Sequence, residues 1–235
     1  MHIPDGYLSP ASAGAMYVAA MPFWYVAARR LRTVLSNKMV PLLSVFSALS
    51  FTIMMFNVPL PGGTSGHAVG GVLMAIVLGP WPAVLGVSIA LIIQALFFGD
   101  GGITAIGANC FNMAVIIPFV GYYIYRLIAV RAPVSSFRHV VGGFVAGYIA
   151  LNAAALAAAV EFGIQPIFWH TADGTPLYAP YGLDKAIPAM MIGHLVAGLA
   201  EALVTGLVIL YLQRSNQSLL LLHKREKTAV QGVLS

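Results

Sequence analysis

The first two residues of the chain, Met1 and His2, carry three nitrogen atoms that short covalent paths hold close together. These are the terminal amine, the His2 backbone nitrogen and the His2 imidazole. Binding through all three closes a five-membered ring through Met1 and a six-membered ring through the His2 side chain, with the donors nearly in one plane. A fourth nitrogen would complete a square. Square-planar nitrogen donors are typical of Ni(II) or Cu(II) rather than of Mg, Ca or Zn.

His67 is the histidine best placed to supply the fourth nitrogen. It lies in a glycine-rich stretch, PLPGGTSGHAVGG (59–71), whose glycines allow positive φ and close approach of another backbone. His170 is the reserve candidate, because it lies in the predicted outer segment 161–185. The amine must also be free, which requires that the initiator formyl group is removed and that Met1 is retained. The alternative, a histidine at a frayed terminus with no ligand role, remains open on the residues alone.

The composition indicates that a lipid bilayer surrounds most of this chain. Of its 235 residues, 60% are hydrophobic and only 8% are charged, whereas soluble domains carry about 25% charged residues. Between Lys38 and Asp100 the sequence has no Asp, Glu, Lys or Arg. The single cysteine, Cys110, excludes an intrachain disulfide and a cysteine-cluster metal site. We therefore expect an all-α, multi-pass membrane protein.

Apolar runs predict seven transmembrane helices in one domain, 1–212, in which the N-terminal segment forms part of the metal site. A spanning helix needs roughly 20 apolar residues, and the third run is short and ends before Pro80. The predicted spans are 10–29, 39–57, 64–79, 83–99, 103–125, 139–160 and 186–212. Residues 213–235 are predicted to form a polar, basic cytoplasmic tail.

The charge distribution predicts that the N-terminus lies outside and the C-terminus in the cytoplasm. Positive loops prefer the cytoplasm, and seven spans place eleven of the 12 Lys and Arg residues on the inner face, with only Lys185 outside. Most of the acidic residues fall outside, namely Asp5, Asp100, Glu161, Asp173 and Asp184. The basic pI is therefore a signal of topology, and it gives no evidence for a nucleic-acid partner.

Several polar residues near the outer ends of the spans are candidates for orienting a ligand histidine. Intramembrane polar groups are costly and often mark functional sites, and hydrogen-bond partners fix the orientation of metal-bound histidines. Helix-to-helix hydrogen bonding is the alternative explanation. The candidates are Asp5, Ser65, Asp100 and Asn109. Glu201, inside the last span, needs a buried partner, for which His194 lies two helical turns away.

Three stretches resemble the signatures of the NikM/CbiM family, the substrate-binding membrane components (S components) of energy-coupling-factor (ECF) uptake transporters for nickel and cobalt. They are MHIPDGYLSP (1–10), PLPGGTSGHAVGG (59–71) and GDGGITAIGANCFNM (99–113). The resemblance runs through most of the chain and covers the C-terminal tail least. It implies seven helices, an outward N-terminus and a square-planar site formed by the Met1 amine, the His2 backbone nitrogen, the His2 imidazole and His67.

The same resemblance implies partners and cargo. Family members work with a transmembrane coupling (T) subunit and cytoplasmic ATPase subunits. A small auxiliary membrane subunit is a third kind of partner that the resemblance allows but does not require. The chain has no Walker motif, so ATP hydrolysis is expected in the partners, and no organic cofactor is expected. HIPDG and GGTSGH look more like nickel-type members, and ligation by a backbone nitrogen favours a planar d⁸ ion. Ni²⁺ is therefore preferred over Co²⁺ as the transported substrate.

Other functions remain as alternatives. A cobalt-uptake component that supplies cobalamin synthesis would have the same architecture. An intramembrane metalloenzyme would need an open coordination position and a general base, and the sequence offers no convincing base beside His67. A structural membrane subunit would bind no metal at all. Metal binding by the purified chain would separate the transport component from the structural subunit.

Overall fold

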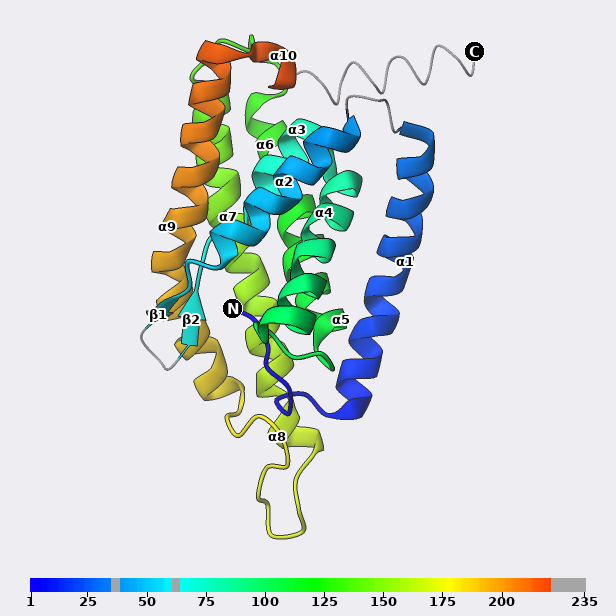
Figure 1. The fold of residues 1–235 in the computed structure, drawn as a ribbon. Coiled ribbons are helices and arrows are strands. Elements are labelled where there is room, and N and C mark those ends of the chain that lie inside the picture. The colour runs from blue at the N-terminus through cyan, green and yellow to red at the C-terminus, as the bar shows by residue number, and fades with distance from the viewer. Residues whose placement is uncertain (35–38, 61–63, 221–235) are drawn as a thin grey trace.

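The computed structural model describes residues 1–34, 39–60 and 64–220, which form a helical bundle with one short β-hairpin (Figure 1). The protein is mostly helical, as predicted. Strands β1 and β2 pair antiparallel, with Pro59 opposite Ser65. The elements in chain order are α1 (Pro10–Val34), α2 (Met39–Met54), β1 (Val58–Leu60), β2 (Thr64–Gly66), α3 (Gly71–Leu78), α4 (Pro80–Ile93), η1 (Gln94–Phe98), α5 (Ile106–Asn109), η2 (Cys110–Ile116), α6 (Ile117–Ala129), α7 (Arg138–Gly163), α8 (Gln165–Phe168), α9 (Leu183–Ser215) and α10 (Gln217–Leu220).

Four stretches of the described chain are long and apolar enough to cross a membrane. They are Pro80–Phe98, Ile106–Ala129, Arg138–Phe168 and Leu183–Ser215. Helix α1 has 25 residues, and the apolar helix α2 has 16. These helices occupy the positions of six predicted spans, with boundaries shifted by a few residues. The total of seven crossings stays a prediction.

The predicted span 64–79 is not one continuous helix. Its first residues form β2, and α3 begins only at Gly71, after Gly70 has taken a left-handed φ of 73°. The eight residues of α3 make a helix about 12 Å long, well short of the roughly 30 Å of a bilayer core. The glycine-rich sequence explains the difference, because glycine favours turns and close backbone approach over regular helix. Every residue of α3 is buried, so this helix belongs to the core.

Helices α7 and α9 pack against each other through small residues. A Cβ on Gly147 would lie 2.9 Å from the Glu201 carbonyl oxygen, and one on Gly163 would lie 2.8 Å from the Leu183 Cα. Because lipid does not drive helices together by the hydrophobic effect, such close backbone approach supplies the van der Waals contact that holds them. The pair forms one side of the bundle in Figure 1 and carries Glu201 into the interior.

Hydrogen bonds between loops define the two ends of the bundle. At one end, the Ala179 N–H donates to the Tyr7 carbonyl oxygen at 3.1 Å, so the N-terminal segment lies beside the segment between α8 and α9. At the other end, the Gln213 side chain donates to the carbonyl oxygens of Val134 and Ser136. Figure 1 shows the start of α1 and the end of α9 at these opposite ends.

Candidate metal centre

The N-terminal segment is threaded into the bundle as an extended chain. Met1 is only 4% exposed and Ile3 is fully buried. The Ile3 N–H donates to Asn109 Oδ1 at 2.8 Å, and Asn109 Nδ2 donates back to the Ile3 carbonyl oxygen at 3.1 Å. The Gly102 N–H donates to the same carbonyl oxygen at 2.8 Å. Asn109, at the end of α5, therefore serves this segment as a neighbouring strand would, and it fixes the position of His2.

Two further anchors hold the segment nearer the surface. The Asp5 carboxylate accepts the N–H groups of Ile103 and Thr104 at 3.1 and 2.8 Å. The Ser9 N–H donates to Gln165 Oε1 at 3.0 Å, just before α1 begins. Each anchor belongs to a different part of the fold, so the segment is fixed along its length and is not a frayed terminus.

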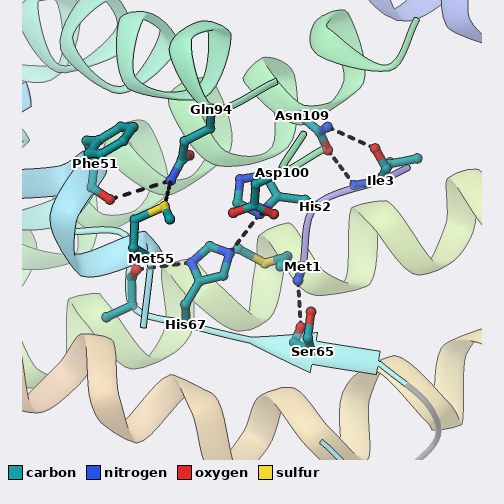
Figure 2. Close-up of polar contacts among 11 residues, drawn as sticks. Met1, His2, Ile3, Phe51, Met55, Ser65, His67, Gln94, Asp100 and Asn109 are labelled. Carbon is teal, nitrogen blue, oxygen red and sulfur yellow. Dashed lines mark hydrogen bonds and ion pairs between the residues drawn. The ribbon is translucent and has the colours of Figure 1, made fainter. Parts of the chain in front are cut away.

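His2 and His67 meet ring against ring inside the bundle (Figure 2). His67 Nε2 lies 3.2 Å from His2 Nδ1, and the ring centroids are 4.8 Å apart. The Met1 amine donates to the Ser65 carbonyl oxygen at 2.5 Å. Ser65 belongs to β2 and stands two residues before His67. The hairpin therefore presents both an anchor for the amine and the second imidazole.

Hydrogen-bond partners assign the role of each imidazole nitrogen. His67 Nδ1 lies 3.1 Å from the Ala68 carbonyl oxygen, so Nδ1 carries the proton and Nε2 keeps its lone pair. His2 Nδ1 lies 3.2 Å from both His67 Nε2 and Asp100 Oδ1. Within the described ranges, no hydrogen bond involves the His2 backbone nitrogen. The Met1 amine, this backbone nitrogen and His2 Nδ1 are covalently linked, and His67 Nε2 adds a fourth corner.

The contact between the two imidazoles has about the length of one edge of a square of nitrogen donors. A metal–nitrogen bond of about 2 Å places neighbouring corners of a square about 2.8 Å apart, and His67 Nε2 lies 3.2 Å from His2 Nδ1. Among the residues that the structure describes, no group of three or more His, Cys, Asp or Glu side chains is placed to hold a metal. A complete site here therefore needs nitrogens of the backbone and the terminus.

Burial keeps the candidate donors uncharged. Removal from water lowers the pKa of the Met1 amine to about 5, against the attraction of Asp100. It lowers the pKa of His2 to about 3, to which the nearby amine contributes, while the Gln94 side chain acts in the opposite direction. Burial likewise lowers the pKa of His67 well below its ordinary value. At neutral pH these three groups are therefore uncharged, and no positive charge on them repels an arriving cation.

Asp100 is the only charged side chain that contacts His2 in the described part of the chain. Its side chain is 24% exposed, against 5% for His2, so it reaches from the imidazole toward the surface. Burial raises the pKa of its carboxyl group, and the Met1 amine opposes that shift. A carboxylate in this position lowers the cost of bringing a cation to the buried nitrogens.

Glu201 and Ser50 hold the backbone that follows His67. The Glu201 side chain is fully buried, and its Oε2 accepts the N–H groups of Val69 and Gly70 at 2.6 and 2.9 Å. The Ser50 hydroxyl donates to the Val69 carbonyl oxygen at 2.7 Å. These bonds come from α9 and α2, and they fix the loop between β2 and α3, which carries the His67 ring.

The remaining predicted residues fall into two groups. His170 lies in the exposed segment after α8, where its Nδ1 contacts a neighbouring carbonyl oxygen at 3.0 Å. His194 is buried and pairs with a carbonyl oxygen of its own helix at 2.7 Å, so it is not the partner of Glu201 that the sequence suggested. The four predicted supporting residues all join the N-terminal segment to the bundle, namely Asp5, Ser65, Asp100 and Asn109.

Gln94, whose side chain lies against the His2 ring (Figure 2), was not predicted as a site residue. Gln94 is fully buried and is the first residue of the π-helical segment η1. Two signals were available for it. A polar residue within an apolar span is costly unless it has a role, and π-helical turns often occur at functional sites.

A family model described as the cobalt uptake substrate-specific transmembrane region, CbiM, matches residues 2–219. The chain belongs to the CbiM family. The CbiM match includes the candidate ligands His2 and His67 and begins one residue after Met1. Membership agrees with the resemblance that the sequence motifs showed, and it makes the chain a multi-pass membrane protein.

The CbiM-family relatives are named as metal transport proteins. A fused nickel transport protein NikMN of Rhodobacter capsulatus is 55% identical over 94% of this chain and 64% of its own length. A probable fused nickel transport protein LarMN of Lactiplantibacillus plantarum is 50% identical, over 91% and 65% respectively. This chain therefore spans slightly less than two thirds of the fused relatives. A putative metal transport protein of Methanocaldococcus jannaschii, 46% identical, matches over 91% of this chain and 92% of its own.

A solved structure has the same CbiM-family fold. A crystal structure of a truncated transition metal transporter superposes with a TM-score of 0.86 at 55% sequence identity, covering 91% of this chain and 99% of that one. The relatives are transport proteins and not enzymes, which agrees with the expectation from the sequence.

Replacing Gly102 by Ala should loosen the N-terminal segment. A Cβ at Gly102 would lie 2.7 Å from the Pro4 carbonyl carbon and 2.6 Å from Asp5 Oδ1, so the two backbones must separate. We expect Gly102→Ala to weaken nickel binding about tenfold, measured by competition with a chelator. Gly14→Ala is the control, because a Cβ there meets nothing within 4 Å. Equal affinity in the two variants would show that this close approach does not position the donors.

Proposed function

We propose that this CbiM-family protein captures Ni²⁺ at the outer membrane face in a planar site of four nitrogens. The donors are the Met1 amine, the His2 backbone nitrogen, His2 Nδ1 and His67 Nε2. The observation that carries this proposal is the 3.2 Å contact between His2 Nδ1 and the lone pair of His67 Nε2. When His2 Nδ1 gives up its proton, two buried lone pairs lie close enough to bind one cation between them.

The fold supplies the geometry before the metal arrives. The N-terminal segment is anchored at Ile3 and Asp5, and the His67 loop is held by Glu201. A cation therefore meets donors whose positions are already fixed, which reduces the entropy lost on binding. One proton must leave the His2 backbone nitrogen. The strong ligand-field stabilisation of a planar d⁸ ion offsets the free-energy cost of removing this amide proton.

Nickel is the favoured cargo, and Co²⁺ is the second candidate. The relatives that match nearly the whole chain at 55% and 50% identity are named for nickel. Those named for cobalt are 36–39% identical and match 54–57% of the chain. The cobalt description of the family model supports the second candidate. The planar four-nitrogen set favours nickel, because square-planar geometry is typical of Ni(II).

We further propose that the chain is the substrate-specific component of an ECF-type, ATP-driven uptake system. A transmembrane coupling (T) subunit and cytoplasmic ATPase subunits would be its partners, and ATP hydrolysis would occur in the latter. The motif resemblance supports this assignment. About a third of the length of each fused relative lies outside the matched region, which is consistent with a further membrane subunit that acts beside this chain.

Metal analysis of the purified, untagged chain beginning at Met1 tests the proposed function. We expect one Ni²⁺ per chain and the yellow-orange absorption of planar, low-spin Ni(II). Competition between Ni²⁺ and Co²⁺ in the same preparation decides the cargo. A chain that takes up neither ion would contradict the proposal, and turnover of a substrate without partner subunits would favour the metalloenzyme instead.

The orientation can be tested with single cysteines at the two ends of the bundle. Ala172 and Ser135 are both exposed, on the segments after α8 and after α6 respectively, and the native Cys110 is buried. Positive loops prefer the cytoplasm, so in intact cells Ala172→Cys should react with an impermeant thiol reagent and Ser135→Cys should not. Ser135→Cys should react once the cells are opened. The reverse pattern would place the candidate metal centre on the cytoplasmic side.

A further inference from the structure

Gln94 carries a buried acceptor that the empty site does not use. Its side chain is fully buried in η1, between α4 and the 99–102 loop. Its Nε2 donates weakly to the Phe51 carbonyl oxygen at 3.4 Å and to Met55 Sδ at 3.8 Å. Its Oε1 has no hydrogen-bond partner in the described structure. Because buried polar atoms are nearly always paired, this oxygen requires an explanation.

The His2 ring has a matching unpaired atom. His2 Nδ1 is engaged by His67 and Asp100, and the Cδ2 edge lies against Gly101, 3.3 Å from where a Cβ would stand. The remaining nitrogen, Nε2, is buried and has no hydrogen-bond partner among the described residues. The Gln94 side chain lies against this ring. Figure 2 draws both residues in the same cluster, with the Gln94 amide joined to Phe51 and Met55.

We propose that Gln94 Oε1 accepts the Nε2–H of His2 in the nickel-loaded protein, so that Gln94 is a positioning residue that selects the metal-binding tautomer. This inference rests on the proposed function. A neutral imidazole has one N–H and one lone pair, and a hydrogen bond at one nitrogen sets which nitrogen binds the metal. An acceptor at Nε2 places the proton there and leaves the lone pair on Nδ1.

The empty site favours the other tautomer. Asp100 Oδ1 and the His67 Nε2 lone pair are both acceptors, and they both face His2 Nδ1 at 3.2 Å. Without metal the proton of this ring therefore belongs on Nδ1, which leaves His2 Nε2 and Gln94 Oε1 as two buried acceptors with no proton to share. Binding nickel at Nδ1 removes that proton, and Nε2 takes one up from water. The ring stays neutral, and both orphaned atoms then become paired.

The backbone of Gln94 connects it to the same group of residues. Its carbonyl oxygen accepts the Asp100 N–H at 3.1 Å. Gln94, the proposed acceptor of the His2 Nε2–H when nickel is bound, thus also holds Asp100. Asp100 is the residue that accepts the His2 Nδ1–H when nickel is absent. A π-helical segment begins at Gln94, and its wider turn sets where the side chain of this residue points.

Substitution of Gln94 separates this role from simple packing. Gln94→Leu removes the acceptor, and Gln94→Glu keeps one in either protonation state. We expect Gln94→Leu to bind nickel 10–100-fold more weakly, the usual effect of losing a hydrogen-bond partner of a ligand histidine, and Gln94→Glu to restore affinity. Gln94→Met provides a second apolar side chain if Leu misfolds. Asn152→Leu is the matched control, because it also removes a buried amide with an unpaired oxygen.

Nitrogen-15 NMR of histidine-labelled protein reads the tautomer directly, since planar Ni(II) is diamagnetic. The loaded wild type should show one exchange-protected Nε2–H from His2, which appears on loading, is lost in Gln94→Leu and is kept in Gln94→Glu. Wild-type affinity in Gln94→Leu, or an unprotected Nε2–H in the loaded wild type, would overturn the inference and leave the proposed function intact. A wild-type chain that binds no planar nickel would instead overturn the proposed function.

Discussion

A chain that begins Gly-Ser-Met1 should bind no planar nickel, although it keeps every side chain of the native protein. The extension turns the Met1 amine into a peptide nitrogen, which is not a basic donor. Its five-membered ring could then close only by deprotonating a second amide. The position is also crowded, because Met1 is 4% exposed and its amine lies 2.5 Å from the Ser65 carbonyl oxygen.

The measurement compares nickel content and visible absorption in the extended chain and the native chain. Gly-Ser added after Ser235 is the matched control, because it has the same composition and lies at the far end of the sequence. We expect the control to retain one planar Ni²⁺ and the N-terminal extension to lose it. A site made only by the two imidazoles would tolerate the extension. Full stoichiometry with an unchanged spectrum in the extended chain would therefore exclude the amine as a ligand.

Replacing His67 by Ala should weaken nickel binding at least tenfold, or roughly 1.4 kcal/mol. The variant loses the corner supplied by His67 Nε2 and keeps the chelate formed by Met1 and His2. The loss should be mainly in metal affinity, since the loop around His67 is held by backbone bonds to Glu201 and Ser50 rather than by the imidazole.

His170→Ala is the control for this prediction, since His170 lies in the exposed segment after α8. Within the described residues, its imidazole hydrogen-bonds to the Thr171 carbonyl oxygen and to no candidate ligand. Titration with a competing chelator gives both affinities. If His170→Ala had the larger effect, the fourth ligand would be wrongly assigned. A loss of folding in His67→Ala, seen as a changed thermal transition of the empty protein, would instead show that the imidazole supports the hairpin.

The meeting of Met1, His2 and His67 could be predicted from the sequence because covalent chemistry limits it. Adjacent residues at a terminus can present three nitrogens only in a few ways, and the glycines before His67 allow another backbone to approach. The structure does bring these residues together. Their role as ligands stays a prediction, as do the number of crossings and the identity of the partners.

Contacts made through the backbone could not be predicted. Glu201 was expected to pair with a side chain, and its partners are the N–H groups of Val69 and Gly70. Ser65 takes part through its carbonyl oxygen, which any residue would have supplied. The span 64–79 was predicted from its apolar composition and from the placement of the basic clusters on one face, and neither shows where a glycine-rich stretch leaves the helix. Gln94 was missed because its relevance comes from an unpaired oxygen beside His2.

The anchoring of the first nine residues determines the order in which the protein can be completed. These residues leave the ribosome first, yet their partners come much later: Met1 pairs with a residue 64 positions on, Ile3 with one 106 positions on and Ser9 with one 156 positions on. Chain closure over such separations comes late in folding. The N-terminal segment therefore gains its anchors in stages, and the set is complete only after Ala179, the partner of Tyr7, has been synthesised. Chains shorter than this lack some of the bonds that hold His2 beside His67, so a fully anchored metal site requires nearly the whole bundle.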